Sequence, residues 1–251
     1  MSGVYKHASY EFEVIRRIGG GAFGEVYEVS LPNCSYRYAL KKLSPIQSIE
    51  YASWLTEGEL LRRFKQEIRY QTECTHKNIV SICVFHESMD PFFVMDLADE
   101  DLLSIINKNS ISQAEKIDAM IDVINGLDYL HNRESGELVH RDIKPANILK
   151  FGEVYKISDF GLIKNTDSEH QNNQDVVTMI NTPLGTERYA APEVLACEYS
   201  RHSDIFALGV VIDEMNILGA DDIVEKCTRR KPKNRYQSVL DIKDDLLRIR
   251  A

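Results

Sequence analysis

The stretch His140-Arg141-Asp142-Ile143-Lys144-Pro145-Ala146-Asn147 combines an acid, a cation and an amide within six residues, from Asp142 to Asn147. Asp142 can accept the proton of a hydroxyl group, and Lys144 can offset charge on a phosphoryl group. The amide oxygen of Asn147 suits Mg²⁺, a hard ion that takes oxygen ligands. A solvated polar turn would rarely contain these groups in this order. The stretch therefore predicts a site that binds Mg²⁺ and a hydroxyl group.

Asp159-Phe160-Gly161 follows VYKIS, an alternating stretch that predicts a strand, and Asp159 comes 17 positions after Asp142. A carboxylate at a strand end is a natural Mg²⁺ ligand, and the glycine lets the chain turn sharply. The polar residues 162–184 predict a long loop, which Gly185–Glu193 (GTERYAAPE) closes. Pro192 also fits a plain loop-to-helix junction, which is compatible with a functional role for the segment.

Gly19-Gly20-Gly21-Ala22-Phe23-Gly24 has the spacing GxGxxG, which alone is a weak signal. A dinucleotide-binding site would need a helix after it, but the following EVYEV alternates as a strand does. We therefore expect a strand–turn–strand hairpin, whose backbone N–H groups can lie over phosphates without obstruction by side chains. A plain glycine turn explains the six residues equally well.

Lys41 lies in the next alternating stretch, YRYALKKL, and could reach the same phosphates. Lys42 should point to the opposite face of the strand. A surface lysine is the alternative interpretation, because Lys41 needs an acidic partner to hold it. The amphipathic residues 55–75 predict a helix with three candidate partners, and the pattern does not choose among them: Glu59, Glu67 and Glu73.

The order of predicted elements indicates an α+β protein with two lobes. Residues 10–43 and 79–97 read as strands around the helix at 55–75, whereas helical spacing prevails after residue 101. We place a strand-rich N-lobe at residues 1–97 and a helical C-lobe at residues 98–251, joined by a hinge.

Composition narrows the class of protein. The 251 residues carry a net charge of −9, which argues against nucleic acid or an acidic membrane surface as the main partner. Five unpaired-looking cysteines without a C-x-x-C motif indicate free thiols. The longest apolar run, Ile205–Ile212, is too short to span a bilayer, and the N-terminus has no apolar signal core. We expect a cytoplasmic protein, whose oligomeric state the sequence does not indicate.

Taken together and in this order, the five motifs resemble the protein-kinase signature set: glycine-rich loop, strand lysine, HRD…N, DFG and APE. The resemblance runs from about Tyr10 to the C-terminus. It implies a two-lobed kinase fold that uses ATP and Mg²⁺ and acts on protein substrates.

The resemblance also implies roles for single residues. Asp142 would be the catalytic base, Lys41 would bind the α- and β-phosphates and pair with Glu67, and Asn147 and Asp159 would hold Mg²⁺. Met95 would be the gatekeeper, and the backbones of Asp96 and Ala98 would bind the purine. The other expected contacts of the nucleotide are Ile18, the loop Gly19, Gly20, Gly21, Ala22, Phe23 and Gly24, and the adenine-sandwiching Val26, Ala39 and Leu149.

Lys144, two residues after the catalytic Asp142, resembles the Ser/Thr-kinase pattern rather than the Tyr-kinase one. Thr186 would contact Asp142 and Lys144 near the peptide site. Asp204 would anchor the catalytic loop, and Arg235 would pair with Glu193.

Arg141 before the catalytic Asp implies regulation by phosphorylation, because a phosphate pairs well with such an arginine. Thr182 is the best-placed acceptor, with Thr178 and Ser168 as rivals, and we expect autophosphorylation there to raise activity.

Two departures from the family pattern stand out. Asp204 and Arg235 are only 31 positions apart, and only residues 216–233 fill the stretch where most members have an additional helix that docks substrates. Gln71 stands where an apolar residue is usual. Two other classes remain as alternatives: a pseudokinase that serves as a scaffold, although Lys41, Asp142, Asn147 and Asp159 are all present, and a small-molecule phosphotransferase, although Gly185–Glu193 resembles a platform for protein substrates.

Overall fold

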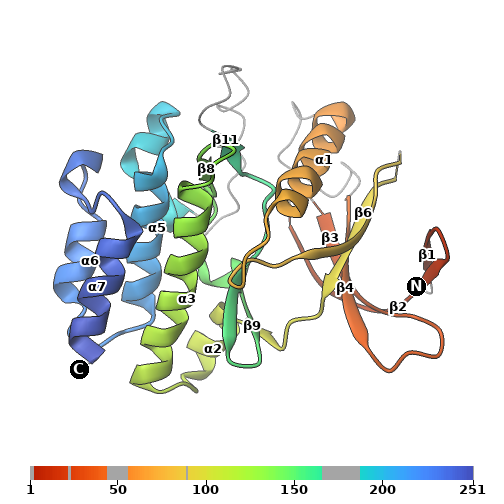
Figure 1. The fold of residues 1–251 in the computed structure, drawn as a ribbon, viewed down its shortest axis with the longest axis horizontal. Helices are drawn as coiled ribbons and strands as arrows, with labels where there is room; N and C mark the ends of the chain where they lie inside the picture. The colour runs from red at the N-terminus through yellow and green to blue at the C-terminus, as the bar shows by residue number, and fades with distance from the viewer. Residues whose placement is uncertain (1–2, 22–23, 44–55, 89, 166–186, 251) are drawn as a thin grey trace. The chain divides into compact units, whose positions relative to one another are not determined.

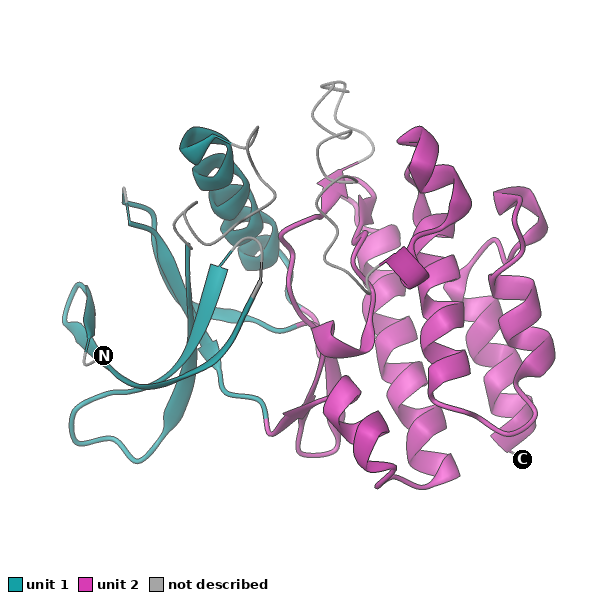
Figure 2. Ribbon diagram, turned by 180° about the vertical axis from the view of Figure 1, so that it is seen from behind, with its two compact units in different colours: residues 1–75, 80–98 teal, residues 76–79, 99–251 magenta. Residues whose placement is uncertain are grey.

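The computed structural model describes residues 3–21, 24–43, 56–88, 90–165 and 187–250 (Figure 1). The chain divides into two compact units, coloured in Figure 2: unit 1 holds residues 1–75 and 80–98, and unit 2 holds residues 76–79 and 99–251. Unit 1 is mostly sheet and unit 2 mostly helix, so the fold is α+β as expected. Within the described residues, no helix is long and apolar enough to cross a membrane.

Unit 1 is built on an antiparallel six-stranded sheet of order β1-β2-β3-β4-β6-β5. Its strands are β1 (Val4–His7), β2 (Tyr10–Gly21), β3 (Gly24–Ser30), β4 (Arg37–Lys42), β5 (Ile82–His86) and β6 (Phe92–Asp96). The sheet is curled: the ring centroid of Tyr5, on the edge strand β1, lies 5.4 Å from that of Phe92 on β6. Strand β1 was not anticipated from the sequence.

The two faces of this sheet are packed differently. On one face Phe12, Val29 and Leu40 belong to a buried apolar cluster. On the other lies the only helix described in unit 1, α1 (Glu57–Glu73), whose Phe64 ring contacts that of Phe93 at 5.6 Å. The hydroxyl of Thr56 caps α1 by accepting from the backbone N–H of Glu59 at 3.2 Å. Strand alternation thus turns Leu40 to one core and Lys41 to the other.

Unit 2 is organised around one central helix, α3, which packs against α7, α5 and a small sheet. Its helices are α2 (Leu102–Lys108), α3 (Gln113–His131), α5 (Arg201–Glu214), α6 (Asp221–Cys227) and α7 (Val239–Arg250). Its strands are β7 (Glu100–Asp101), β8 (Leu138–Val139), β9 (Ile148–Phe151), β10 (Val154–Ile157) and β11 (Lys164–Asn165), paired as β10-β9-β7 and β11-β8.

Residues 76–79 join unit 2 because they hydrogen-bond to β10. The Asn78 amide donates to the Tyr155 carbonyl at 3.0 Å, and the Ile157 N–H donates to the Asn78 carbonyl at 2.9 Å. Gly126 of α3 permits this approach, because a Cβ there would lie 2.8 Å from the Asn78 carbonyl oxygen. Nothing in the sequence pattern indicated this arrangement, and the sequence-based prediction placed residues 76–79 in the N-lobe at 1–97.

Candidate active site

Lys41 and Glu67 form a buried ion pair inside unit 1. The Nζ–Oε1 distance is 2.5 Å, and the side chains are 8% and 1% exposed. The rival acids are engaged elsewhere: Glu59 binds Arg62 and Arg63, and Glu73 binds Arg69. The geometry therefore selects Glu67 from the three candidates that the sequence left open.

The glycine-rich segment forms the hairpin between β2 and β3. Gly19 pairs with Val26, and Gly21 pairs with Gly24, so the first glycines belong to the strand rather than to a separate turn. A Cβ on Gly24 would lie only 2.7 Å from the backbone oxygen of Lys42 in β4, which explains glycine at that position. Two of the predicted contacts, Ala22 and Phe23, lie outside the described residues.

The other predicted nucleotide contacts in unit 1 lie on β2, β3, β4 and β6. Register places Val26 opposite Lys41, and Ala39 opposite Met95. Ala39 and Met95 are buried, whereas Ile18 is 37% exposed. Asp96 ends β6. The backbone of Ala98, two residues later, makes no hydrogen bond within the described residues, so its N–H is available to a ligand.

Asp142 is the centre of a hydrogen-bonded cluster in unit 2. The Lys144 ammonium donates to both carboxylate oxygens, at 3.0 and 2.8 Å. The Asn147 amide donates to Asp142 Oδ2 and to the Asp142 backbone carbonyl, both at 2.8 Å. A 3₁₀ turn, Pro145–Asn147, brings the amide back to the acid. Asp142, Lys144 and Asn147, which the sequence analysis selected, are therefore joined by hydrogen bonds.

Burial is the main influence on the pKa of Asp142, and it raises that pKa above the usual range. The nearby ammonium of Lys144 lowers it, and the negative charge of Asp159 raises it again. The carboxyl is thus a stronger base than an exposed aspartate, although Lys144 limits the effect.

Asp204 of α5 holds the backbone of this segment. Its carboxylate accepts the backbone N–H groups of His140 and Arg141, each at 2.9 Å. Arg141 has φ 71°, a left-handed conformation that non-glycine residues seldom adopt. Such strain persists only where the surroundings impose it, and the two hydrogen bonds to Asp204 do so here.

His131, at the end of α3, is the third partner of Asp204, with Nε2 2.9 Å from Oδ2. Burial raises the pKa of Asp204, but the hydrogen bonds from His131 and from the backbone outweigh it, and the pKa is lowered overall. The sequence reading missed His131. Its only signal was a histidine in the last turn of a predicted helix, shortly before the HRD motif.

Ser158, which directly precedes Asp159, links the segment of Asp159 to Asn147. Both the N–H and the hydroxyl of Ser158 donate to the Asn147 carbonyl at 2.9 Å. The next residue, Asp159, has φ 63°, and its carboxylate accepts from the Gly161 N–H at 3.3 Å. Leu149 lies two residues after Asn147, in β9, and is half-buried.

These residues suit Mg²⁺. The Asn147 NH₂ group donates to Asp142, so the amide oxygen of Asn147 remains as the possible metal ligand. That oxygen accepts no hydrogen bond within the described residues. A carboxylate and an amide oxygen are ligands of the type Mg²⁺ takes, with phosphate and water completing its shell. A protein-only cage is not needed, and no group of three His, Cys, Asp or Glu residues in the described part could form one.

A second cluster ties the APE segment to the C-terminal part of unit 2. Arg235 donates to both carboxylate oxygens of Glu193, at 2.6 and 2.8 Å. Both side chains are almost completely buried. Burial raises the pKa of Glu193, but Arg235 more than offsets this, and the pKa is lowered overall. The pairing is the one that the resemblance implied.

Arg141 stacks on an aromatic ring that sequence reasoning overlooked. Its guanidinium lies 3.5 Å from the centroid of Tyr199, and the ammonium of Lys164 lies 5.7 Å from the same ring. Two cations therefore share one tyrosine. The predicted phosphorylation sites Ser168, Thr178 and Thr182 lie outside the described residues, as does Thr186, the predicted contact of Asp142 and Lys144.

Gln71 follows Glu67 by one helical turn and is 1% exposed. Its amide donates to the Val80 carbonyl at 2.9 Å, while its own oxygen accepts no hydrogen bond among the described residues. The polar residue at this usually apolar position therefore ties α1 to the chain before β5.

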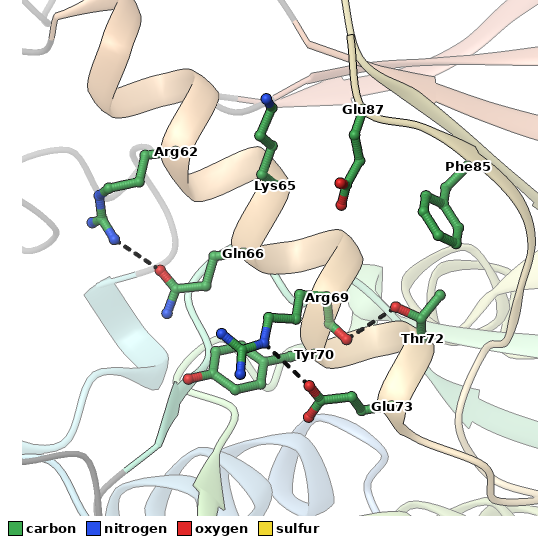
Figure 3. A pocket seen from close by; sticks show the side chains of 9 residues that line it. All are labelled: Arg62, Lys65, Gln66, Arg69, Tyr70, Thr72, Glu73, Phe85 and Glu87. Atoms are coloured by element: carbon green, nitrogen blue, oxygen red, sulfur yellow. Dashed lines mark hydrogen bonds and ion pairs between the residues drawn. The ribbon is translucent and has the colours of Figure 1, made fainter.

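Figure 3 shows a hollow lined by side chains of α1 and of the chain at the end of β5. The lining residues from α1, among them Arg62, Lys65 and Arg69, are three or four positions apart and so share one face of the helix. Phe85 lies in β5, and Glu87 is the first residue after that strand. Glu67 is on the buried side of the helix. None of the predicted site residues lines this hollow, so it is separate from the candidate active site.

Comparison with known proteins agrees with these arrangements. Aurora kinase of Saccharomyces cerevisiae is 30% identical over 221 residues, which are 86% of this chain and 55% of that protein. Extracellular signal-regulated kinase 7 of Drosophila melanogaster is 29% identical over 81% of this chain and 22% of its own length. The membrane-associated tyrosine- and threonine-specific cdc2-inhibitory kinase of the same fly is 30% identical over 83% and 37%.

The matched part of the chain therefore spans from about a fifth to just over half of the length of these relatives. The family model of the protein kinase domain matches residues 12–240, which include every motif described above. With the ion pair of Lys41, the cluster around Asp142 and the Glu193–Arg235 pair inside that match, this chain belongs to the protein kinase domain family.

Proposed function

We propose that the chain transfers the γ-phosphoryl group of ATP to serine and threonine hydroxyl groups of proteins. The observation that carries the proposal is the cluster in which Lys144 and Asn147 both donate to the carboxylate of Asp142. The same three groups are the ones that a hydroxyl acceptor and a phosphoryl group need.

In the proposed reaction, the substrate oxygen attacks the γ-phosphorus, the bond from phosphorus to the β–γ bridging oxygen breaks, and ADP leaves. Asp142 accepts the hydroxyl proton, for which its raised pKa is favourable. Lys144 offsets negative charge on the phosphoryl oxygens, and Asn147 orients the carboxylate through its NH₂ group. Bound Mg²⁺, held by Asn147 and Asp159, would neutralise phosphate charge.

Residues of unit 1 would hold the nucleotide. The Lys41 ammonium, fixed by Glu67, would bind phosphate oxygens, and the N–H groups of the β2–β3 hairpin would do the same. The backbone N–H of Ala98 would bind the purine. Serine and threonine are favoured as acceptors because Lys144 follows Asp142 by two residues, a feature of Ser/Thr kinases.

Incubation with [γ-³²P]ATP, Mg²⁺ and mixed protein substrates tests the function, with phosphosites mapped by mass spectrometry beside an Asp142→Asn control. We expect phosphoserine and phosphothreonine from the parent and none from the variant. Phosphotyrosine alone would overturn the acceptor class. ATP binding without transfer would indicate a scaffold, and transfer only to small molecules would indicate a different phosphotransferase.

We further propose that phosphorylation of residue Thr182, or of its rival Thr178, raises activity. The support is electrostatic: the cations of Arg141 and Lys164 both lie over the ring of Tyr199, and a phosphate of about −1.5 to −2 charge would pair favourably with such an arginine. Enzymes with Thr182→Ala and Thr178→Ala should show reduced kcat after preincubation with ATP. Full activity in both variants would sink this part of the proposal.

A further inference from the structure

A short segment between α6 and α7 concentrates positive charge in a chain whose net charge is −9. Four cations lie within five residues, all exposed, and we call this segment the cationic loop: Arg229, Arg230, Lys231 and Lys233. Arg229 has one exposed ion pair, with Glu225 at 3.3 Å. The other three form no ion pair with any residue that the structure describes. Their charge is therefore available to a partner.

The backbone of the cationic loop is fixed from inside the protein. The buried guanidinium of Arg235 donates to the carbonyls of Arg229 and Arg230, at 2.7 and 3.2 Å. The carbonyl of Lys231 accepts the N–H of Asn234 at 2.9 Å. Three carbonyl oxygens, which would repel an anion, are thus engaged within the protein. The side chains project from a backbone that needs little further ordering when a ligand binds.

The surroundings restrict the size of an anionic partner. The flanking helices carry exposed acids on both sides of the loop: Asp221, Asp222 and Glu225 in α6, and Asp241 and Asp244 in α7. A membrane or a nucleic-acid duplex would extend over these carboxylates, and charges separated by about 8 Å or less still interact at physiological salt. A short acidic peptide can contact the loop alone.

The loop is also joined directly to the APE segment. The same Arg235 that holds the loop carbonyls binds Glu193 in the 3₁₀ turn Pro192–Ala196. A segment bound at the cationic loop would therefore contact a loop that shares its buried anchor, Arg235, with the segment that resembles the protein-substrate platform. The sequence lacks the additional helix that docks substrates in most family members, and the loop belongs to the short stretch that remains.

We propose that the cationic loop docks substrates through a short run of aspartate and glutamate residues outside the phosphorylated site. The proposal rests on the proposed protein kinase function, and it names the substrate class: proteins with an acidic segment close to the acceptor serine or threonine. Docking would lower KM for such substrates and leave kcat unchanged, because the loop contains none of the residues around Asp142.

Binding is tested first, without catalysis, by the fluorescence anisotropy of a fluorescein-labelled peptide of eight alternating Asp and Glu residues. The variant is Arg230→Ala/Lys231→Ala/Lys233→Ala. The control is Lys77→Ala/Lys108→Ala/Arg248→Ala, which removes three exposed positive charges elsewhere in unit 2. We expect the parent and the control to bind alike, and the loop variant to bind at least about five-fold more weakly. Equal weakening in both variants, or in neither, would overturn the proposal.

Two comparisons exclude wider anions. Vesicles of phosphatidylcholine with phosphatidylserine, and a 20-nucleotide duplex DNA, are tested with the same three proteins. Tighter loop-dependent binding of either than of the acidic peptide would assign the loop to another partner and overturn the proposal.

Phosphotransfer then separates docking from catalysis. An acceptor peptide that the parent phosphorylates is made with and without an acidic tail of six residues. The tail should lower KM about five-fold or more for the parent and the control but not for the loop variant, with kcat equal in all three. A tail without effect would overturn the docking proposal while leaving the kinase function intact. Absence of any phosphotransfer would remove the kinase function, and the anisotropy result would show whether the loop still binds acidic peptides.

Discussion

Asp142 and Asp204 are both buried, yet their pKa values shift in opposite directions. Asp204 accepts two backbone N–H groups and His131, so its charged form is well solvated by the protein. Asp142 has a cation and one amide as partners, but also the negative charge of Asp159 nearby. The anchor thus stays ionised, while the proposed base keeps affinity for a proton. Hydrogen-bond partners rather than depth of burial separate the two roles.

The Lys41–Glu67 pair gives the first prediction. Glu67→Gln leaves Lys41 buried beside a neutral amide, and removing one partner of a buried ion pair is strongly destabilising. We expect the free energy of unfolding to fall by about 3 kcal/mol. The measurement is urea denaturation followed by far-UV circular dichroism.

Glu73→Gln is the matched control on the same helix. Its pair with Arg69 is exposed, and such pairs contribute at most about 1 kcal/mol. Similar losses in the two variants would show that burial of the Lys41–Glu67 pair does not stabilise unit 1.

The same residues show how far sequence reasoning reaches at this scale. The motifs located Lys41, Asp142, Asn147 and Asp159 because their spacing along the chain is itself informative. The choice of Glu67 over its neighbours needed either the resemblance or coordinates, since all three acids recur on one helix. His131 and Tyr199 could not be found, because they act through distant partners, Asp204 and Arg141, and belong to no local pattern.

At the scale of elements, two helical glycines give opposite predictions for the same substitution. A Cβ on Gly209 of α5 would lie 2.3 Å from the Cβ of Cys227 in α6, so Gly209→Ala must force the helices apart. Overpacking of this kind costs about 1–3 kcal/mol, more than the roughly 1 kcal/mol that alanine gains in helix propensity. At Gly58 in α1 the nearest atom, Thr56 Oγ1, is 3.9 Å away.

Gly58→Ala should therefore stabilise the protein by up to about 1 kcal/mol, while Gly209→Ala destabilises it. Thermal unfolding of both variants, measured side by side with the parent, gives the two signs. A stabilised Gly209→Ala protein would mean that α5 and α6 do not pack as closely as described.

Elements were predictable wherever periodicity was strong. The helix over residues 55–75 and the strands around it follow from alternation and amphipathic spacing. Strand β1 and helix α6 were not foreseen. Each is short, and each is stabilised by contacts that are remote in sequence, such as the ring contact of Tyr5 with Phe92. The close approach of α6 to Gly209 is likewise a tertiary feature with no periodic signal.

For the whole molecule, the buried histidines predict how stability depends on pH. His140 is fully buried, its Nε2 lies 3.1 Å from the Ser158 carbonyl, and its Nδ1 accepts the Asp142 N–H at 3.3 Å. This arrangement suits the neutral ring, and burial lowers the pKa of His140. Burial also lowers the pKa of His76, which is only partly enclosed.

In the unfolded chain a histidine titrates near 6.5. Below that pH the unfolded state binds protons that the folded state excludes. The stability that the neutral histidine contributes is therefore fully present above pH about 6.5, and it is lost as the pH falls toward the folded-state pKa. Asp204 and Glu193 have lowered pKa values, so their contributions disappear only at more acidic pH, below the ordinary carboxyl range. Between pH 7.5 and 5.5 the lowered pKa values of the histidines therefore reduce stability as pH falls, whereas the raised pKa of Asp142 acts in the opposite direction.

The free energy of unfolding of the parent should decrease over that interval by up to about 1.4 kcal/mol per pH unit for His140 alone. His140→Asn keeps groups that can donate to Ser158 and accept from Asp142 but cannot titrate, so its pH profile should be flatter even though the variant is less stable at pH 7.5. Urea denaturation at intervals of half a pH unit measures both slopes. Parallel profiles would show that His140 does not carry the pH dependence, and a His76→Gln variant with a flatter profile would transfer the effect to that residue.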